Sequence, residues 1–136
     1  MPLNNALRWI SEEVAYLIHR EQLAEHGGLD GVRDAGLLAS AMARPQQLFA
    51  YGGEGVDLAA LAAAYAFGIA RNHPFIDGNK RTSLVVSLAF LGRNGYCLAA
   101  DKVDVYRTFL ALGAGELAEE VLVEWFRTHI RESKAH

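Results

Sequence analysis

Apolar side chains recur at helical spacing along most of the chain. In the clearest case they follow the spacing i, i+3, i+4, i+7 and i+11 from Leu58 to Ile69. Asp57 precedes this run as a helix cap, and Pro74 follows it as a breaker. The same reasoning predicts six helices: 12–26, 35–43, 58–72, one from 79 or 80 to 93, one that begins at 101 or 104, and one that begins at 116. The chain is therefore predicted to be all-α.

The helix predicted to begin at 79 or 80 has the most continuous apolar surface. Residues 84–91 are apolar on nearly every side, which is typical of a helix at the centre of a fold. Strand signals are weak, and residues 96–98 give the best of them. The segment 46–56 follows Pro45 and contains three glycines, so we expect a loop or, at most, a short β-hairpin there. These features predict a helical bundle around the 80–93 helix.

Length and composition fit a single domain over residues 1–136, with a core at about 8–131 and a flexible polar tail at the C-terminus. Of the 136 residues, 51% are hydrophobic and 21% are charged, as in ordinary folded domains. A single cysteine excludes an intrachain disulfide. The formal net charge of −3 gives no support to direct binding of DNA or of an anionic membrane, because both attract basic proteins.

No segment has the pattern of a membrane span or of an export signal. The longest apolar stretch, residues 58–70, has 13 residues and is rich in alanine, whereas a span needs about 20. The N-terminus has no basic region followed by an apolar one. We therefore expect no membrane partner and a cytoplasmic location.

The segment 73–82 gathers polar side chains between the two most apolar predicted helices, where chemistry is commonly placed. Gly78 and Asn79 stand at the entry of a helix, and free backbone N–H groups at such an end bind anions. Lys80 and Arg81 add positive charge at the same end. Their charge opposes the helix dipole, and a bound phosphate would remove this conflict.

Two further groups in this segment fit chemistry on a bound phosphate. Asp77 offers oxygens suited to Mg²⁺, and His73 can take a proton near neutral pH. Together these groups suit phosphoryl or nucleotidyl transfer from a magnesium nucleotide to a hydroxyl. From the residues alone, solvated charges on a structural loop remain the alternative. The other histidines are interpreted as packed or surface side chains: His19, His26, His129 and His136.

Residues 73–81, His-Pro-Phe-Ile-Asp-Gly-Asn-Lys-Arg, resemble the signature H-P-F-x-[DE]-G-N-[GK]-R of the Fic/Doc (Fido) superfamily. Residues 27–38 and 93–96 resemble the corresponding segments of death-on-curing (Doc) toxins, which belong to type II toxin–antitoxin systems. The similarity covers most of residues 10–130. It implies the all-α Fido fold, and a bacterial or phage-encoded protein.

The resemblance also implies roles for single residues. His73 would be the general base that deprotonates a target hydroxyl, and Asp77 would hold Mg²⁺. Phe75 would anchor the loop in the core. The positions that match nucleotide-binding positions of the family are Gly78, Asn79, Lys80, Arg81 and Arg71. Residues 46–56 would form the flap that clamps the target by strand-like pairing, with Phe49 and Tyr51 as candidates.

The resemblance implies that Lys80 distinguishes two chemistries within the family. AMP-transferring Fic proteins have glycine at this position, whereas Doc proteins have lysine. The resemblance therefore implies a kinase that uses ATP and Mg²⁺ to phosphorylate a Ser or Thr hydroxyl of a protein. The expected target is elongation factor Tu, so that translation stops. Pro74 and Gly78 are the Fic-like choices, so protein AMP transfer (AMPylation) is the alternative. A non-catalytic module that only binds an antitoxin is a second alternative.

The resemblance further implies how such a toxin is restrained. Doc toxins are held by a cognate antitoxin peptide, which we expect in a groove of this chain. Many Fic proteins carry an inhibitory helix with the motif [ST]-x-x-x-E-[GN]. Residues 128–133 nearly match that motif but lack its final Gly or Asn, so restraint by an antitoxin is the expectation.

Overall fold

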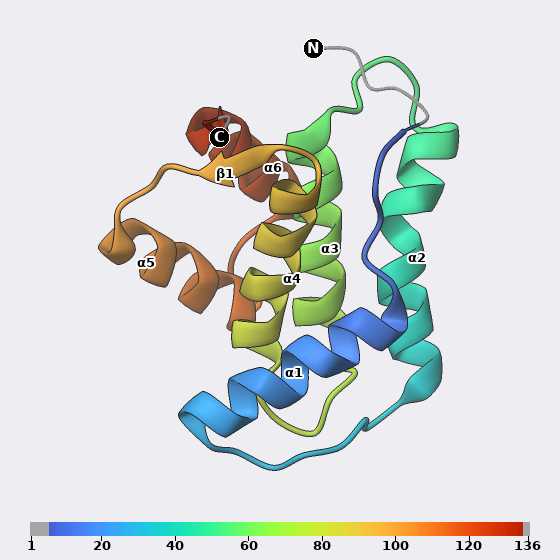
Figure 1. Cartoon of the computed structure of the whole chain (residues 1–136), viewed down its shortest axis with the longest axis vertical. Helices are drawn as coiled ribbons and strands as arrows, with labels where there is room; N and C mark the ends of the chain where they lie inside the picture. The colour runs from blue at the N-terminus through green and yellow to red at the C-terminus, as the bar shows by residue number, and fades with distance from the viewer. Residues whose placement is uncertain (1–5, 135–136) are drawn as a thin grey trace.

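The structure is a computed structural model, and it describes residues 6–134. Within that range the chain forms six α-helices and two short strands (Figure 1). Their bounds are Glu12–His26 (α1), Ala35–Tyr51 (α2), Leu58–Asn72 (α3), Asn79–Arg93 (α4), Tyr96–Leu98 (β1), Lys102–Gly113 (α5), Glu119–His129 (α6) and Ile130–Glu132 (β2). The prediction of an all-α fold is confirmed.

Four helices begin where a polar side chain caps them. The capping side chains, each of which accepts a hydrogen bond from a backbone N–H in the first turn, are Ser11, Asp34, Asp57 and Asp101. A cap of this kind contributes about 1 kcal/mol. The last helix begins at Glu119, not at Glu116 as predicted. The reason is that the N–H of Glu116 donates to the carbonyl of Ala111 (2.9 Å), which ties residue 116 to the end of α5.

The most enclosed helix is α3 and not α4, so the prediction of α4 as the centre of the bundle is wrong. Eleven of the 15 residues of α3 are buried, against seven of 15 in α4. α3 packs against α2, α4 and α6, and it stands in the middle of the bundle in Figure 1. Small side chains allow this close packing: a Cβ built at Gly68 would lie 3.3 Å from the Cα of Ala41 in α2. On α4, Leu84 and Leu88 are only half buried.

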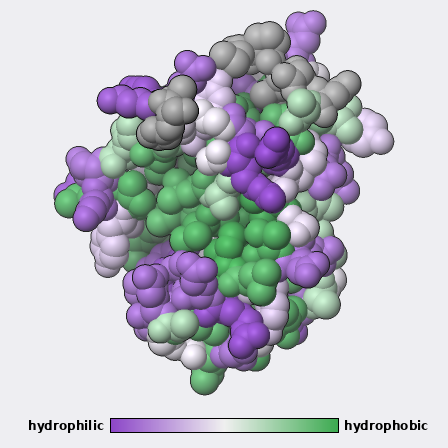
Figure 2. Space-filling view, viewed as in Figure 1, coloured by the Kyte–Doolittle hydropathy of each residue, from purple (hydrophilic) through white to green (hydrophobic). Residues whose placement is uncertain are grey.

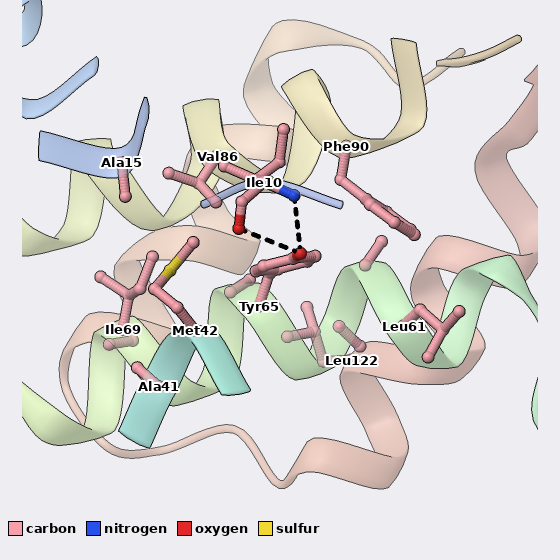
Figure 3. Close-up of a cluster of buried hydrophobic side chains, with 14 of the residues drawn as sticks. Ile10, Ala15, Ala41, Met42, Leu61, Tyr65, Ile69, Val86, Phe90 and Leu122 are labelled. Carbon is pink, nitrogen blue, oxygen red and sulfur yellow. Dashed lines mark hydrogen bonds between the residues drawn. The ribbon is translucent and has the colours of Figure 1, made fainter. Parts of the chain in front are cut away.

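A buried tyrosine fastens the segment before α1 to the core. The Oη of Tyr65 in α3 accepts a hydrogen bond from the N–H of Ile10 (2.9 Å) and donates one to its carbonyl (3.3 Å), as Figure 3 shows. Burial raises the pKa of Tyr65 to about 12, although its hydrogen bond to Ile10 and the charge of Arg93 lower it in part. The hydroxyl therefore keeps its proton and can make both bonds.

Contrary to prediction, α2 continues past Pro45 for another turn and a half. A proline inside a helix costs about 3 kcal/mol, because it removes a backbone hydrogen bond and crowds the preceding turn. Packing of the residues beyond it offsets this cost. Leu48 and Phe49 pack on the core, and the ring of Phe49 meets that of Trp9 edge-on at a centroid distance of 5.7 Å. The expectation that the helix ends at Ala43 is therefore wrong, and of the loop expected at 46–56 only residues 52–56 lie outside a helix.

β1 and β2 form a two-stranded antiparallel sheet in which Tyr96 lies opposite Glu132 and Leu98 opposite Ile130. The strand predicted at 96–98 is confirmed. Residues 131–132 belong to β2 and not to the expected flexible tail, while residues 135–136 of that tail lie outside the described residues. No helix within the described part of the chain is both long and apolar enough to cross a membrane.

Candidate active site

The loop of residues 73–78 joins α3 to α4 at the end of the bundle that α1 crosses (Figure 1). His73 ends α3 in the left-handed region, with φ 48° and ψ 55°. Among residues 6–134 it is the one non-glycine residue with positive φ. This conformation costs about 1–2 kcal/mol, and such strained residues cluster at functional sites, where their surroundings hold them.

Arg33, in the loop before α2, holds this strained turn. Its Nε donates to the carbonyl of His73 (2.7 Å), and its Nη2 donates to the carbonyl of Asn72 (2.8 Å). Its backbone N–H donates to the carbonyl of Pro74 (2.7 Å). The guanidinium thus satisfies carbonyl groups that the end of a helix leaves without partners. Arg33 therefore fixes the backbone that carries the His73 side chain.

Phe75 lies in the core, where it is 1% exposed, which is the place expected for an anchor of the loop. The side chain of Asn79 closes the loop around it: Oδ1 accepts a hydrogen bond from the Phe75 N–H (3.0 Å), and Nδ2 donates to the Phe75 carbonyl (2.9 Å). Phe75 also forms an isolated antiparallel bridge with Val32. Burying the Asn79 amide is tolerated because these bonds satisfy it.

The imidazole of His73 is exposed. Its Nδ1 lies 3.4 Å from the Nδ2 of Asn79, which is longer than a usual hydrogen bond. Within the described chain neither ring nitrogen is held by a strong bond, so a nitrogen of the neutral ring is free to accept a proton. The side chain can therefore act as a base towards a group that approaches this end of the bundle.

The carboxylate of Asp77 is exposed but held by two backbone N–H groups. Oδ1 accepts from Gly78 (2.9 Å), and Oδ2 accepts from Leu29 (3.2 Å). Gly28 permits this approach, since a Cβ built there would lie 2.9 Å from Oδ2. Each oxygen keeps a further lone pair for a cation. No group of three or more metal-ligating side chains occurs among the residues described.

The start of α4 offers unpaired donors to an anion. Gly78 precedes the helix in a left-handed conformation, φ 76°, and no side chain of the described chain caps it. The Nε of Arg81 is buried and has no hydrogen-bond partner within residues 6–134. Buried donors of this kind are rare. A phosphate at this helix end would pair with that Nε and with the free N–H groups of the first turn.

The side chain of Lys80 extends towards α5. A Cβ built at Gly113 would lie 3.2 Å from the Cδ of Lys80, so a glycine at that position leaves room for the lysine stem. The Nζ lies 5.9 Å from the centroid of the Tyr106 ring, a cation–π contact that contributes about 0.5–1 kcal/mol at an exposed site. A contact this weak leaves the ammonium free to turn to a phosphate.

A cavity of about 630 Å³ adjoins His73. α3 contributes Phe67 and Arg71 to it, and residues 112–118 between α5 and α6 form another wall. The guanidinium carbon of Arg71 lies 5.9 Å from the centroid of the Phe67 ring. The volume lies within the range of about 300–1,000 Å³ that is typical of small-molecule sites. The structure thus brings the predicted base and the predicted basic position Arg71 to one cavity.

Comparison with known proteins assigns this chain to a family. The model of the Fic/DOC family matches residues 9–91. This chain belongs to the Fic/Doc family. It is 40% identical to the protein kinase doc of Escherichia phage P1 over 89 residues, which are 65% of this chain and 70% of the relative. It is 49% identical to the Toxin Doc of Mycolicibacterium smegmatis over 76 residues, which are 55% of this chain and 58% of that relative.

The expected target flap does not lie beside His73 in this Fic/Doc chain. Phe49 packs against Trp9, whereas Tyr51 at the end of α2 is 88% exposed. The segment that follows α2 leads into the start of α3, and His73 is at the end of α3. A helix of that length spans about 22 Å. Because residues 46–51 extend α2, they end at the opposite end of the bundle (Figure 1), so the assignment of Phe49 and Tyr51 to the flap is corrected.

Three residues that sequence reasoning missed support the site of this family member from segments that are distant in sequence. They are His19 on α1 and Gly28 and Arg33 in the loop between α1 and α2. His19 belongs to the stripe of α1 that faces the core together with Ala15 and Gln22. A polar ring on such a stripe is the signal that could have found it. Gly28 and Arg33 lie in the segment 27–38 that resembles Doc toxins, but that resemblance gave neither residue a role in the site.

Proposed function

We propose that this Fic/Doc chain is a Doc-type toxin that transfers the γ-phosphate of ATP to a Ser or Thr hydroxyl of a protein. The observation that carries the proposal is the gathering of unpaired donors at the start of α4, including the buried Nε of Arg81, beside an exposed carboxylate and an exposed imidazole. The relatives named as a kinase and as a toxin support it. Elongation factor Tu is the proposed target, on the resemblance of residues 73–81 to Doc toxins.

The residues at the start of α4 would hold the ATP phosphates. The free N–H groups of the first turn and the Nε of Arg81 donate to phosphate oxygens, and Lys80 adds a mobile positive charge. Arg71 lines the cavity beside His73 from α3 and contributes a guanidinium there. These donors stabilise negative charge where it develops during transfer, without reorganisation of the loop.

Asp77 would hold Mg²⁺ through the lone pairs that its two N–H partners leave free. When bound, Mg²⁺ neutralises charge on the phosphates. His73 takes the proton of the target hydroxyl. The hydroxyl oxygen forms a bond to the γ-phosphorus, the bond between that phosphorus and the β–γ bridging oxygen breaks, and ADP leaves. The brace that Arg33 provides keeps the His73 backbone in place throughout.

Lys80 decides which phosphate can occupy the anion site. Its stem runs beside Gly113 on α5, and its ammonium is free to meet the end of the nucleotide. We expect the purified protein to label its target from ATP marked on the γ-phosphate and not from ATP marked on the α-phosphate. Label from the α-phosphate would instead establish AMP transfer. Lys80→Gly should lower γ-phosphate transfer, and a gain of AMP transfer in this variant would show that the side chain selects the phosphate.

An exposed apolar face provides the place for an antitoxin. Figure 2 shows apolar side chains gathered over α1, α4 and α5, and the exposed ones include Leu17 on α1 and Val103 and Leu110 on α5. We propose that an amphipathic segment of the cognate antitoxin covers this face. Leu17→Glu should weaken antitoxin binding and leave transfer unchanged. Tyr51→Glu is the matched control at the other end of the bundle, and it should change neither.

Restraint from within the chain has no geometric support. Glu132, the acidic residue of the near-match at 128–133, is in β2 and lines a separate cavity of about 760 Å³ together with Asp57 at the start of α3. His73 is at the far end of that helix. The toxin should therefore be harmful when expressed without its antitoxin. The His73→Ala variant should be harmless, and harmless expression of the wild type would contradict the toxin assignment.

A further inference from the structure

His19 is a polar ring in the middle of an apolar contact. It is 0% exposed, and its ring stacks on that of Phe75 with a centroid distance of 4.0 Å and an interplanar angle of 7°. Its Nε2 lies 2.8 Å from the carbonyl oxygen of Asp77. A Cβ built at Gly78 would lie 3.7 Å from the Cδ2 of His19. The imidazole therefore contacts the carbonyl of Asp77 and lies beside the position that a Gly78 side chain would occupy.

The bond to Asp77 fixes how the His19 ring is protonated. A carbonyl oxygen can only accept, so Nε2 must carry the hydrogen. In the neutral ring Nδ1 then holds a lone pair, and Nδ1 is buried without a hydrogen-bond partner within residues 6–134. A phenylalanine could also stack on Phe75 and would leave no unpaired nitrogen. Packing alone therefore does not account for a histidine here, whereas the bond to Asp77 does.

We propose that His19 is a positioning residue that aims the Asp77 carboxylate at the cation. This inference rests on the proposed function, in which Asp77 holds Mg²⁺. His19 holds the carbonyl of Asp77 from the side of α1, while the N–H of Leu29 holds the carboxylate itself. The two contacts fix both ends of the residue. An Asp77 that loses the first contact can rotate about its backbone, so its oxygens spend less time in the geometry that Mg²⁺ requires.

Three variants separate the hydrogen bond from the ring stack. His19→Phe keeps the stack and removes the donor. His19→Gln removes the stack but places an amide N–H where Nε2 was, whereas His19→Asn reaches only the position of Nδ1. Because Gln and Asn both lose the stack, a general loss of stability affects them alike. Thermal unfolding measured on each variant identifies its folded fraction.

The measurement is calorimetric binding of ADP at increasing Mg²⁺ concentration, with no target protein present. We expect His19→Phe and His19→Asn to need about 10- to 100-fold more Mg²⁺ for half-maximal enhancement of binding, and His19→Gln to remain near the wild type. ADP binding without Mg²⁺ should be equal in all four proteins. Equal Mg²⁺ requirements in His19→Phe and the wild type, or in His19→Gln and His19→Asn, would overturn the inference.

Asp77→Asn separates a failure of this inference from a failure of the proposed function. If Asp77→Asn loses the effect of Mg²⁺ while the three His19 variants keep it, the metal site stands and the positioning role is refuted. If Asp77→Asn responds to Mg²⁺ like the wild type, the proposed metal site is refuted and the role of His19 falls with it.

Discussion

Replacement of Arg81 by alanine separates nucleotide binding from proton transfer. Its buried Nε has no partner within the described chain, so in the free protein Arg81→Ala breaks no bond of that nitrogen and removes an unsatisfied donor. A hydrogen bond to a charged group contributes about 1.5–3 kcal/mol. At 1.4 kcal/mol per factor of ten, this loss raises the dissociation constant for ADP about 10- to 150-fold. The same variant should unfold at the wild-type temperature or above it.

The assay is calorimetric binding of ADP with Mg²⁺, run beside two controls. His73→Ala removes an exposed ring whose contact with Asn79 is long, so it should abolish transfer and leave the dissociation constant within about two-fold, or less than 0.5 kcal/mol. Arg93→Ala removes a guanidinium from the other end of α4, where it donates to the carbonyl of Trp9, and it should not change ADP binding. Equal losses of binding in the Arg81 and His73 variants would refute the division of roles.

Three further changes test the supports of the site and the fold. Gly28→Ala places a Cβ 2.9 Å from the Oδ2 of Asp77 at a φ of 122°, so it should reduce Mg²⁺-dependent ADP binding and also lower stability by about 1–3 kcal/mol, measured by denaturant unfolding. Tyr65→Phe leaves two buried backbone groups without their partner and should cost about 1–3 kcal/mol of unfolding free energy; an unchanged midpoint would contradict the role of the hydroxyl. Burial raises the pKa of Asp57, but its bonds to Arg127 and to a backbone N–H outweigh this and lower the pKa below its usual 3.8. Because the carboxylate binds protons less readily in the folded state, its contribution is present above pH 3.8 and is lost as the pH falls through the lowered value. Asp57→Asn should therefore flatten the fall in stability between neutral and acid pH, followed by urea unfolding across that range.

Local signals predicted the two helices that carry the site. Asp57 and Pro74 bound α3, and the left-handed Gly78 and Asn94-Gly95 bound α4, so periodicity and helix ends agree. The predicted end of α2 before Pro45 was wrong because it considered only the local cost of a proline inside a helix. The contact that offsets this cost involves Trp9, which is far away in sequence. The central place of α3 was missed for a similar reason. Strong hydrophobicity marked α4, but the small side chains of α3 let its neighbours approach more closely.

The polar groups of the candidate site could be picked out from the sequence because they lie in nine consecutive residues, 73–81. Their supports could not, since His19 is 58 residues from Asp77 and Arg33 is 40 residues from His73. Those contacts depend on the crossing of α1 over the end of the bundle, which no local pattern encodes. The prediction of the flap was wrong because the resemblance placed it by position in the sequence alone. Residues 46–51 instead extend α2 and lie at the end of the bundle opposite His73.

The cavity beside His73 is built from two portions of the chain that differ in their relation to the family. The match to the family covers residues 9–91, which contain the reactive loop and all of its braces. The wall formed by residues 112–118 lies outside that match. In the proposed function, the residues that carry the chemistry and the residues that limit access to His73 therefore lie in separate stretches of the sequence. A change in the turn between α5 and α6 would alter which surface reaches the imidazole, while the proposed phosphate-binding end of α4 would stay as it is.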